Sequence, residues 1–115
     1  MPTAKAAKSV RDDIFKAFEE MVRKAMRPDI PIPQRQALFN RAQELRAQWL
    51  ELEAARFNSD AAAFQKAQDR VSAAVTDLRV AIQDLDDIVK IAEKATKVFG
   101  LVDKLLRQAV KFIVL

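Results

Sequence analysis

Cysteine, histidine and tyrosine are absent from the sequence, and glycine occurs once in 115 residues. The lack of cysteine excludes disulfide bonds and thiolate chemistry. The lack of histidine removes the commonest general base and the commonest metal ligand. The glycine turns and β-branched runs that strand-rich folds need are scarce, whereas alanine is abundant. The composition therefore predicts an all-α fold.

Catalytic motifs are missing as well. No serine, threonine or lysine stands beside a recognisable base, and no glycine-rich phosphate loop occurs. Asp84 and Asp87 would share one helix face, but a calcium loop requires a glycine and a spaced set of oxygen ligands. We therefore interpret residues 84–87 as a solvated acidic segment. We predict a protein that is not an enzyme and that binds no metal or cofactor.

Long apolar runs are also lacking. The sequence has no stretch of 18 or more apolar residues, so no single helix is predicted to cross a membrane. The basic residues near the start lead into no apolar segment of the kind found in a secretory signal. We expect a cytoplasmic protein, with peripheral attachment to a membrane as the alternative. The length predicts one helical domain over residues 1–115.

The first part of the chain predicts a helix followed by a stiff connection. Apolar residues at helical spacing place this helix over residues 3–27, with Ser9 opening a candidate capping box. Three prolines follow within residues 28–33. Because proline cannot continue a helix, this segment is predicted to be extended. We expect its Ile30 and Ile32 to pack over one end of the bundle.

The second helix is predicted over residues 33–57, since proline is tolerated in a first helical turn. Its inward stripe consists of Leu38, Ala42, Leu45, Trp49 and Leu52. Trp49, the only tryptophan, is predicted to be a buried structural anchor. Asn58 is predicted to adopt the left-handed conformation that ends many helices, and a tight turn then leads into the next helix.

Residues 60–115 contain no proline and repeat an apolar pattern every seven residues. Heptad position a is occupied by Phe64, Val71, Leu78, Leu85, Ala92, Phe99, Leu106 and Ile113. Position d is occupied by Ala67, Ala74, Ala81, Ile88, Ala95, Val102 and Ala109. Such an uninterrupted phase is typical of a helix that packs along its whole length, as in a coiled coil. The alanines predict a close approach of the second helix.

Length decides how such a helix could be covered. More than fifty residues would span about 80 Å, whereas each of the first two helices would span about 37 Å. Residues 86–115 would then be uncovered, although their apolar face is wider because position g turns apolar there. Three arrangements are open: a break near residues 84–87 that makes a four-helix bundle, a straight helix paired with another chain, or a helix on a membrane surface.

The uninterrupted heptad favours a continuous helix, and the matched lengths favour the four-helix bundle. Our leading interpretation is an antiparallel bundle of three helices with a very long C-terminal helix, and the four-helix bundle is the alternative. This choice determines whether the apolar face of residues 86–115 is a surface or part of a core.

With a continuous helix, the apolar face of residues 86–115 predicts the function. We expect interaction with another helical protein, or self-association into an oligomer. The residues expected to make this contact are Ile91, Val98, Phe99, Val102, Leu105, Leu106, Phe112 and Ile113. Because the chain ends in a basic amphipathic segment, a membrane-binding protein is the alternative.

Positive charge is concentrated in the same part of the chain. Residues 88–115 carry six basic and two acidic side chains, whereas residues 28–87 carry seven basic and ten acidic ones. The residues predicted to contact an anionic surface are Lys90, Lys97, Lys104, Arg107 and Lys111. Anionic lipid is favoured over nucleic acid because no exposed aromatic residue interleaves with them. A solvated outer face would give the same pattern.

Overall fold

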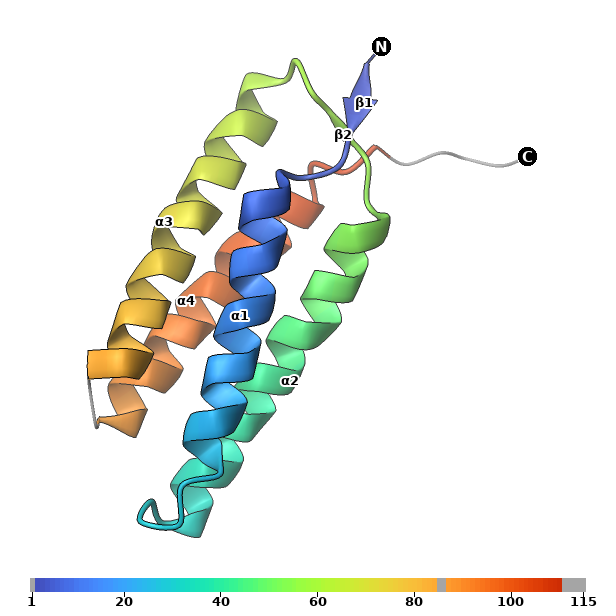
Figure 1. Ribbon diagram of the computed structural model, residues 1–115. Helices are drawn as coiled ribbons and strands as arrows, with labels where there is room; N and C mark the ends of the chain where they lie inside the picture. Colours follow the sequence, from blue (N-terminus) through green and yellow to red (C-terminus); the bar gives the residue numbers. More distant parts are fainter. Residues whose placement is uncertain (1, 85–86, 111–115) are drawn as a thin grey trace.

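Four helices make up most of the protein in a computed structural model, which describes residues 2–84 and 87–110 (Figure 1). They are α1 (Lys8–Ala25), α2 (Ile32–Ala54), α3 (Ala62–Asp84) and α4 (Ile88–Leu106), and two short strands accompany them, β1 (Thr3–Ala4) and β2 (Phe57–Asn58). The helices pack against one another as a bundle. The predicted all-α helical bundle is therefore confirmed.

The helices form two antiparallel hairpins that lie side by side. α1 packs against α2 and α3, and α4 packs against α3 and α2. In Figure 1, α1 and α3 run from the upper end of the bundle to the lower end, and α2 and α4 return. The segment between α2 and α3 therefore crosses the upper end of the bundle. The main neighbours of α3 are α1 and α4, so the predicted approach of the second helix to its alanines is wrong.

The predicted continuous helix over residues 60–115 is also wrong, and the chain adopts the alternative four-helix arrangement. α3 ends at Asp84, and Asp87 has extended backbone angles (φ −87°, ψ 96°) as the N-cap of α4. The Asp87 carboxylate accepts a hydrogen bond from the backbone N–H of Lys90 at 3.2 Å, which satisfies a free donor of the first turn. The buried heptad positions change across this reversal: α3 buries positions a and d, as at Val71 and Ala74, whereas α4 buries positions d and g, as at Ala95 and Val98. Both stripes face one core.

The apolar face of α4 lies in that core. Its fully buried residues are Ile91, Val98, Val102 and Leu105, and those of α3 are Val71, Val75 and Leu78. Ala74 and Ala81 of α3 and Ala95 of α4 are buried between the larger side chains, and their small size lets the helices approach closely. The four helices have 18, 23, 23 and 19 residues, so each is long enough to cover its neighbours.

Ion pairs join α1 to both of its neighbours. The Arg11 guanidinium of α1 donates to both carboxylate oxygens of Glu53 in α2, each at 2.9 Å. Arg79 of α3 reaches α1 and pairs with Glu20 at 2.8 Å and with Asp13 at 3.3 Å. Hydrogen bonds between charged groups are stronger than those between neutral groups. These pairs therefore help to set how α2 and α3 lie against α1.

The inward stripe of α2 differs from the prediction at one position. Gln48 is buried, and its side-chain amide donates to the backbone carbonyl of Phe99 in α4 at 2.9 Å. Trp49 is half-buried and packs on Phe15 of α1, with ring centroids 4.8 Å apart. The tryptophan is thus a structural contact between α1 and α2, but it lies at the edge of the core and is only partly buried, contrary to the prediction.

A buried lysine caps the lower end of α3. Lys24 of α1 points its amine at the last turn of α3 and donates to the backbone carbonyl of Ile82 at 2.8 Å. Carbonyls in the last turn of a helix have no donor within the helix. A cation also suits the negative end of the helix dipole. Lys24 therefore caps α3 from a neighbouring helix.

The segment between α2 and α3 closes the upper end of the bundle. β2 pairs antiparallel with β1, so that Ala4 lies opposite Phe57, and Phe57 also forms an antiparallel bridge with Ala109 after α4. The Phe57 side chain is fully buried and stacks on Phe64, with ring centroids 4.8 Å apart. The segments before α1 and after α4 therefore meet at β2.

Two predictions about helix ends are wrong. Residues 3 and 4 form β1 instead of the start of the first helix, and the N-cap of α1 is Ala7, so Ser9 opens no capping box. The backbone N–H of Ala7 donates to the side-chain oxygen of Gln68 at 2.6 Å. Asn58 lies in β2 and is not left-handed, because no non-glycine residue in the described ranges has a positive φ.

Replacing Phe57 by alanine tests the closure of the upper end. The change removes a fully buried ring and its stacking partner for Phe64. We expect the free energy of unfolding to fall by about 3–5 kcal/mol, measured by urea denaturation followed by circular dichroism. Phe39→Ala is the control, because Phe39 is exposed on α2. An equal loss in both variants would contradict the role given to Phe57.

Candidate binding groove between α3 and α4

The apolar residues predicted to bind a partner are distributed between core and surface. Ile91, Val98, Val102 and Leu105 are fully buried by the other helices, Leu106 is half-buried and Phe99 is partly exposed. Phe112 and Ile113 lie outside the described residues. The predicted exposure is wrong for the four buried residues, because α4 folds back against α3 and α2. Self-association through them stays a prediction, and it would require the bundle to open.

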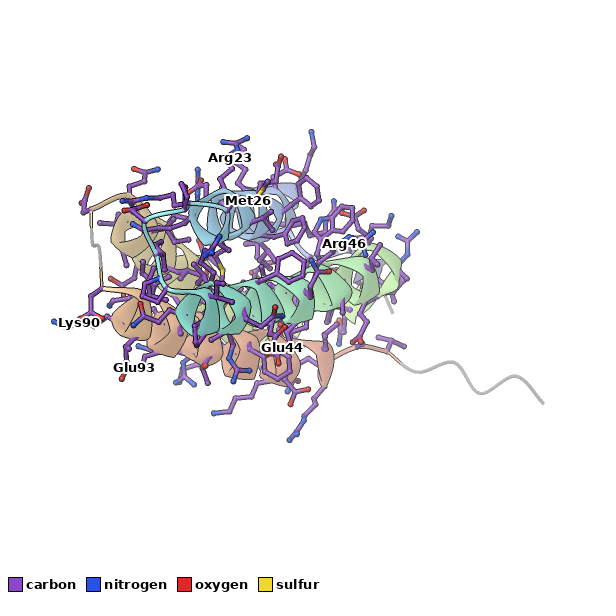
Figure 2. All side chains as sticks on the ribbon, turned by 90° about the horizontal axis from the view of Figure 1, so that it is seen from below. Arg23, Met26, Glu44, Arg46, Lys90 and Glu93 are labelled. Carbon is purple, nitrogen blue, oxygen red and sulfur yellow. The ribbon has the colours of Figure 1, made fainter. Side chains whose placement is uncertain are left out.

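The basic residues predicted to meet an anionic surface lie in solvent. Lys90, Lys97, Lys104 and Arg107 are exposed along the outer side of α4, and Lys111 lies outside the described residues. Three of the four border a groove between α4 and α3. Lys90 lies nearer the lower end of α4 (Figure 2). The structure thus places these cations beside a surface of α3 that the sequence did not predict to be part of a binding site.

The groove consists of two adjoining hollows that share Arg70. The lower hollow has a volume of about 550 Å³ and is lined by Arg70, Ala73, Ala74, Asp77, Lys97 and Leu101. The upper hollow has a volume of about 300 Å³ and is lined by Ala63, Lys66, Ala67, Arg70, Lys104, Arg107 and Gln108. We refer to these residues together as the α3/α4 groove.

Small residues on α3 create the floor of the α3/α4 groove. Ala63, Ala67 and Ala74 recur at helical spacing along the line where α3 meets α4. Their short side chains leave a shallow depression between the two helices. Leu101 of α4 adds the largest apolar side chain to the lining. The floor is therefore apolar, and the long cationic side chains of both helices stand along its edges.

Positive charge exceeds negative charge in the α3/α4 groove. Among its lining residues, five are lysines or arginines and one, Asp77, is a carboxylate. Asp77 accepts a hydrogen bond from Lys94 at 2.7 Å, and Arg107 pairs with Asp103 at 3.0 Å. The groove therefore offers an apolar floor between basic edges and favours an acidic ligand.

The Lys94–Asp77 pair lies at the lower end of the lower hollow, where a further hollow toward Lys90 and Glu93 adjoins it, and the pair changes the acidity of Asp77. The hydrogen bond from Lys94 lowers the pKa of the Asp77 carboxyl, and the charges of Lys94 and Lys97 lower this pKa further. The carboxylate consequently stays ionised, and the pair intact, over a wider acidic range than an isolated aspartate would allow.

The other candidate sites offer less. Asp84 and Asp87 are exposed, and Asp87 serves as the N-cap of α4. Within residues 2–84 and 87–110 no group of three or more potential metal ligands comes together. No helix in the same ranges is long and apolar enough to cross a membrane.

Comparison with protein-family models, curated proteins and solved structures finds no match to this chain.

Lys66 and Arg70 are the groove residues that sequence reasoning missed. They lie four residues apart on α3 and flank Ala67, a spacing that puts both cations on one side of the helix. This signal is visible in the sequence. Its meaning depends on the antiparallel pairing of α3 with α4, which brings Lys66 opposite Lys104 across the upper hollow.

Replacing Lys94 by methionine tests the electrostatics at the lower end of the groove. We expect the Asp77 pKa, measured by NMR titration of its carboxyl carbon, to rise toward the ordinary aspartate value. Because this pKa is lower in the folded protein than in the unfolded chain, the pair stabilises the fold above the unfolded pKa and loses its effect as the pH falls through the folded pKa. Lys16→Met on α1 is the control. An unchanged Asp77 pKa in Lys94→Met would contradict the assignment.

Proposed function

We propose that the protein is a non-enzymatic binding module that holds an acidic amphipathic helix of another protein in the α3/α4 groove. The observation that supports this most directly is the combination of an apolar floor with cationic edges. Amphipathic helices bind such grooves by placing apolar residues on the floor. Acidic residues beside that stripe would then meet the lysines and arginines.

The dimensions of the groove suit a short helix. Lys97 of α4 and Arg107, the C-cap of α4, border the groove, and their separation of ten positions spans about 15 Å along the helix axis. If the contact continues to Lys90, it spans about 26 Å. A partner helix of about 10 to 18 residues would cover this length.

The two other functions that the sequence leaves open, nucleic-acid binding and membrane binding, receive weaker support. Nucleic acid would use the cations but would gain little from an alanine and leucine floor, and no aromatic residue lines the groove for base stacking. Membrane binding through residues 97–115 would require the apolar face of α4, whose Val98, Val102 and Leu105 are fully buried. A protein helix uses both the floor and the edges without opening the bundle.

A labelled synthetic peptide tests the proposal. The probe is a helix of about 18 residues with leucine and alanine on one face and glutamate on both sides of it, and binding is measured by fluorescence anisotropy. We expect the double variant Arg70→Glu with Lys104→Glu to bind at least about tenfold more weakly, since it reverses two charges that face the probe. The matched control is Arg46→Glu, an exposed charge reversal on α2 (Figure 2).

Two further probes separate the possible ligands. A peptide of the same length with glutamine in place of glutamate reports on the apolar floor alone, and single-stranded oligothymidine reports on charge alone. The proposal predicts that the acidic amphipathic peptide binds more tightly than either. Equal loss of binding in the Arg46→Glu control, or tighter binding of the oligonucleotide, would contradict it.

A further inference from the structure

Three apolar side chains are exposed to solvent at the turn between α1 and α2 and in the first part of α2. Met26 is 73% exposed, Ile32 70% and Phe39 40%. Together with Ala25, Arg35 and Gln36 they line a hollow of about 360 Å³. We refer to these six residues as the α1/α2 tip. Single exposed apolar residues are normal on protein surfaces, but a group that shares one hollow indicates a contact site.

The backbone holds the tip in a fixed shape. Prolines at positions 28, 31 and 33 restrict the turn, and the Arg27 guanidinium pairs with Asp29 at 2.6 Å across it. Ile30 is buried and anchors the turn to the core, as predicted, whereas the predicted packing of Ile32 is wrong. Because the turn is stiff, presenting Ile32 to a ligand costs little conformational entropy.

The tip lies at an extremity of the molecule. In Figure 1 the turn between α1 and α2 reaches beyond the ends of α3 and α4 at the lower end of the bundle. Figure 2 looks onto this end and shows Met26 beside Arg23. Arg35 stands in the hollow itself. Of the acidic residues nearby along the chain, Asp29 is the partner of Arg27, and Glu20, which shares a neighbouring hollow with Arg23, pairs with Arg79. The exposed acids Asp84 and Asp87 lie at the adjoining ends of α3 and α4, and these two helices end short of the tip in Figure 1.

We propose that the α1/α2 tip inserts into the interface of a bilayer that contains anionic lipid. Met26 and Ile32 would enter the boundary between headgroups and acyl chains, where apolar side chains gain from leaving water. Arg23 and Arg35 would stay level with the phosphate groups, as basic residues beside a buried apolar group do. A protruding apolar turn with a basic edge suits this surface better than it suits a flat protein partner.

This contact is independent of the α3/α4 groove. The tip is formed by the first hairpin and the groove by the second. It also differs from a membrane contact through residues 97–115, because it exposes no core residue. A few shallow side chains bind a membrane weakly and reversibly, so the protein would exchange between membrane and solution while its groove stays open.

Because the chain has no natural cysteine, a single dye can report on the tip. The test uses Ile32→Cys in the full chain, labelled with an environment-sensitive fluorophore and mixed with vesicles of phosphatidylcholine and phosphatidylserine. We expect a blue shift and brighter emission at position 32. The matched control is Leu50→Cys with the same label, since Leu50 is an exposed apolar residue on α2 away from the turn. We expect no shift there.

Co-sedimentation with the same vesicles tests the tip without a dye. We expect Met26→Glu to reduce the bound fraction about fivefold by placing a repelled charge at the insertion point, and Val80→Glu, on exposed α3 surface, to leave it unchanged. No emission change at position 32, equal changes at positions 32 and 50, or equal binding to vesicles of phosphatidylcholine alone would overturn the proposal. A blue shift that grows with protein concentration in the absence of vesicles would overturn it in favour of a second copy of the chain.

Discussion

Burial of the apolar face of α4 is the constraint on which the rest of the bundle depends. Ile91, Val98, Val102 and Leu105 are fully buried, and burial of each such side chain is worth about 1.5–3 kcal/mol. The sum is similar to the whole net stability of a small domain, about 5–15 kcal/mol. This face can be covered within one chain only if α4 reverses direction after α3. The reversal then places the second hairpin beside the first and sends the α2–α3 segment across the upper end.

The fold class and the helical faces could be predicted from the sequence, because scarce glycine and periodic apolar residues act locally. The break at residues 84–87 could not be decided, since apolar residues occupy heptad positions a and d on both sides of it in the sequence. The crossing of the α2–α3 segment and its pairing with β1 were also beyond prediction. Strands of two residues have no periodicity, and backbone pairing carries no side-chain signal.

Only the α4 side of the candidate groove could be predicted, because the sequence shows local charge patterns but does not show which helices pack together. Lys97 and Lys104 recur at one heptad position and can be read from the sequence, whereas Lys66 and Arg70 gain meaning only when α3 lies antiparallel to α4. Local charge patterns show that a face is basic. Tertiary packing decides which two faces combine, and it also decides that Ile32 is left in solvent while Ile30 is buried.

The distance between positions 66 and 104 tests this account most directly. Both lysines are exposed and line the upper hollow, and the cysteine-free chain allows spin labels at Lys66→Cys and Lys104→Cys. The distance between the two labels is measured by pulsed electron–electron double resonance in a large excess of unlabelled protein. The folded-back bundle predicts a distance of about 15–25 Å, since packed helix axes lie 8–10 Å apart. A distance near 57 Å, the length of 38 residues in one straight helix, would contradict the reversal after α3 and the groove built on it.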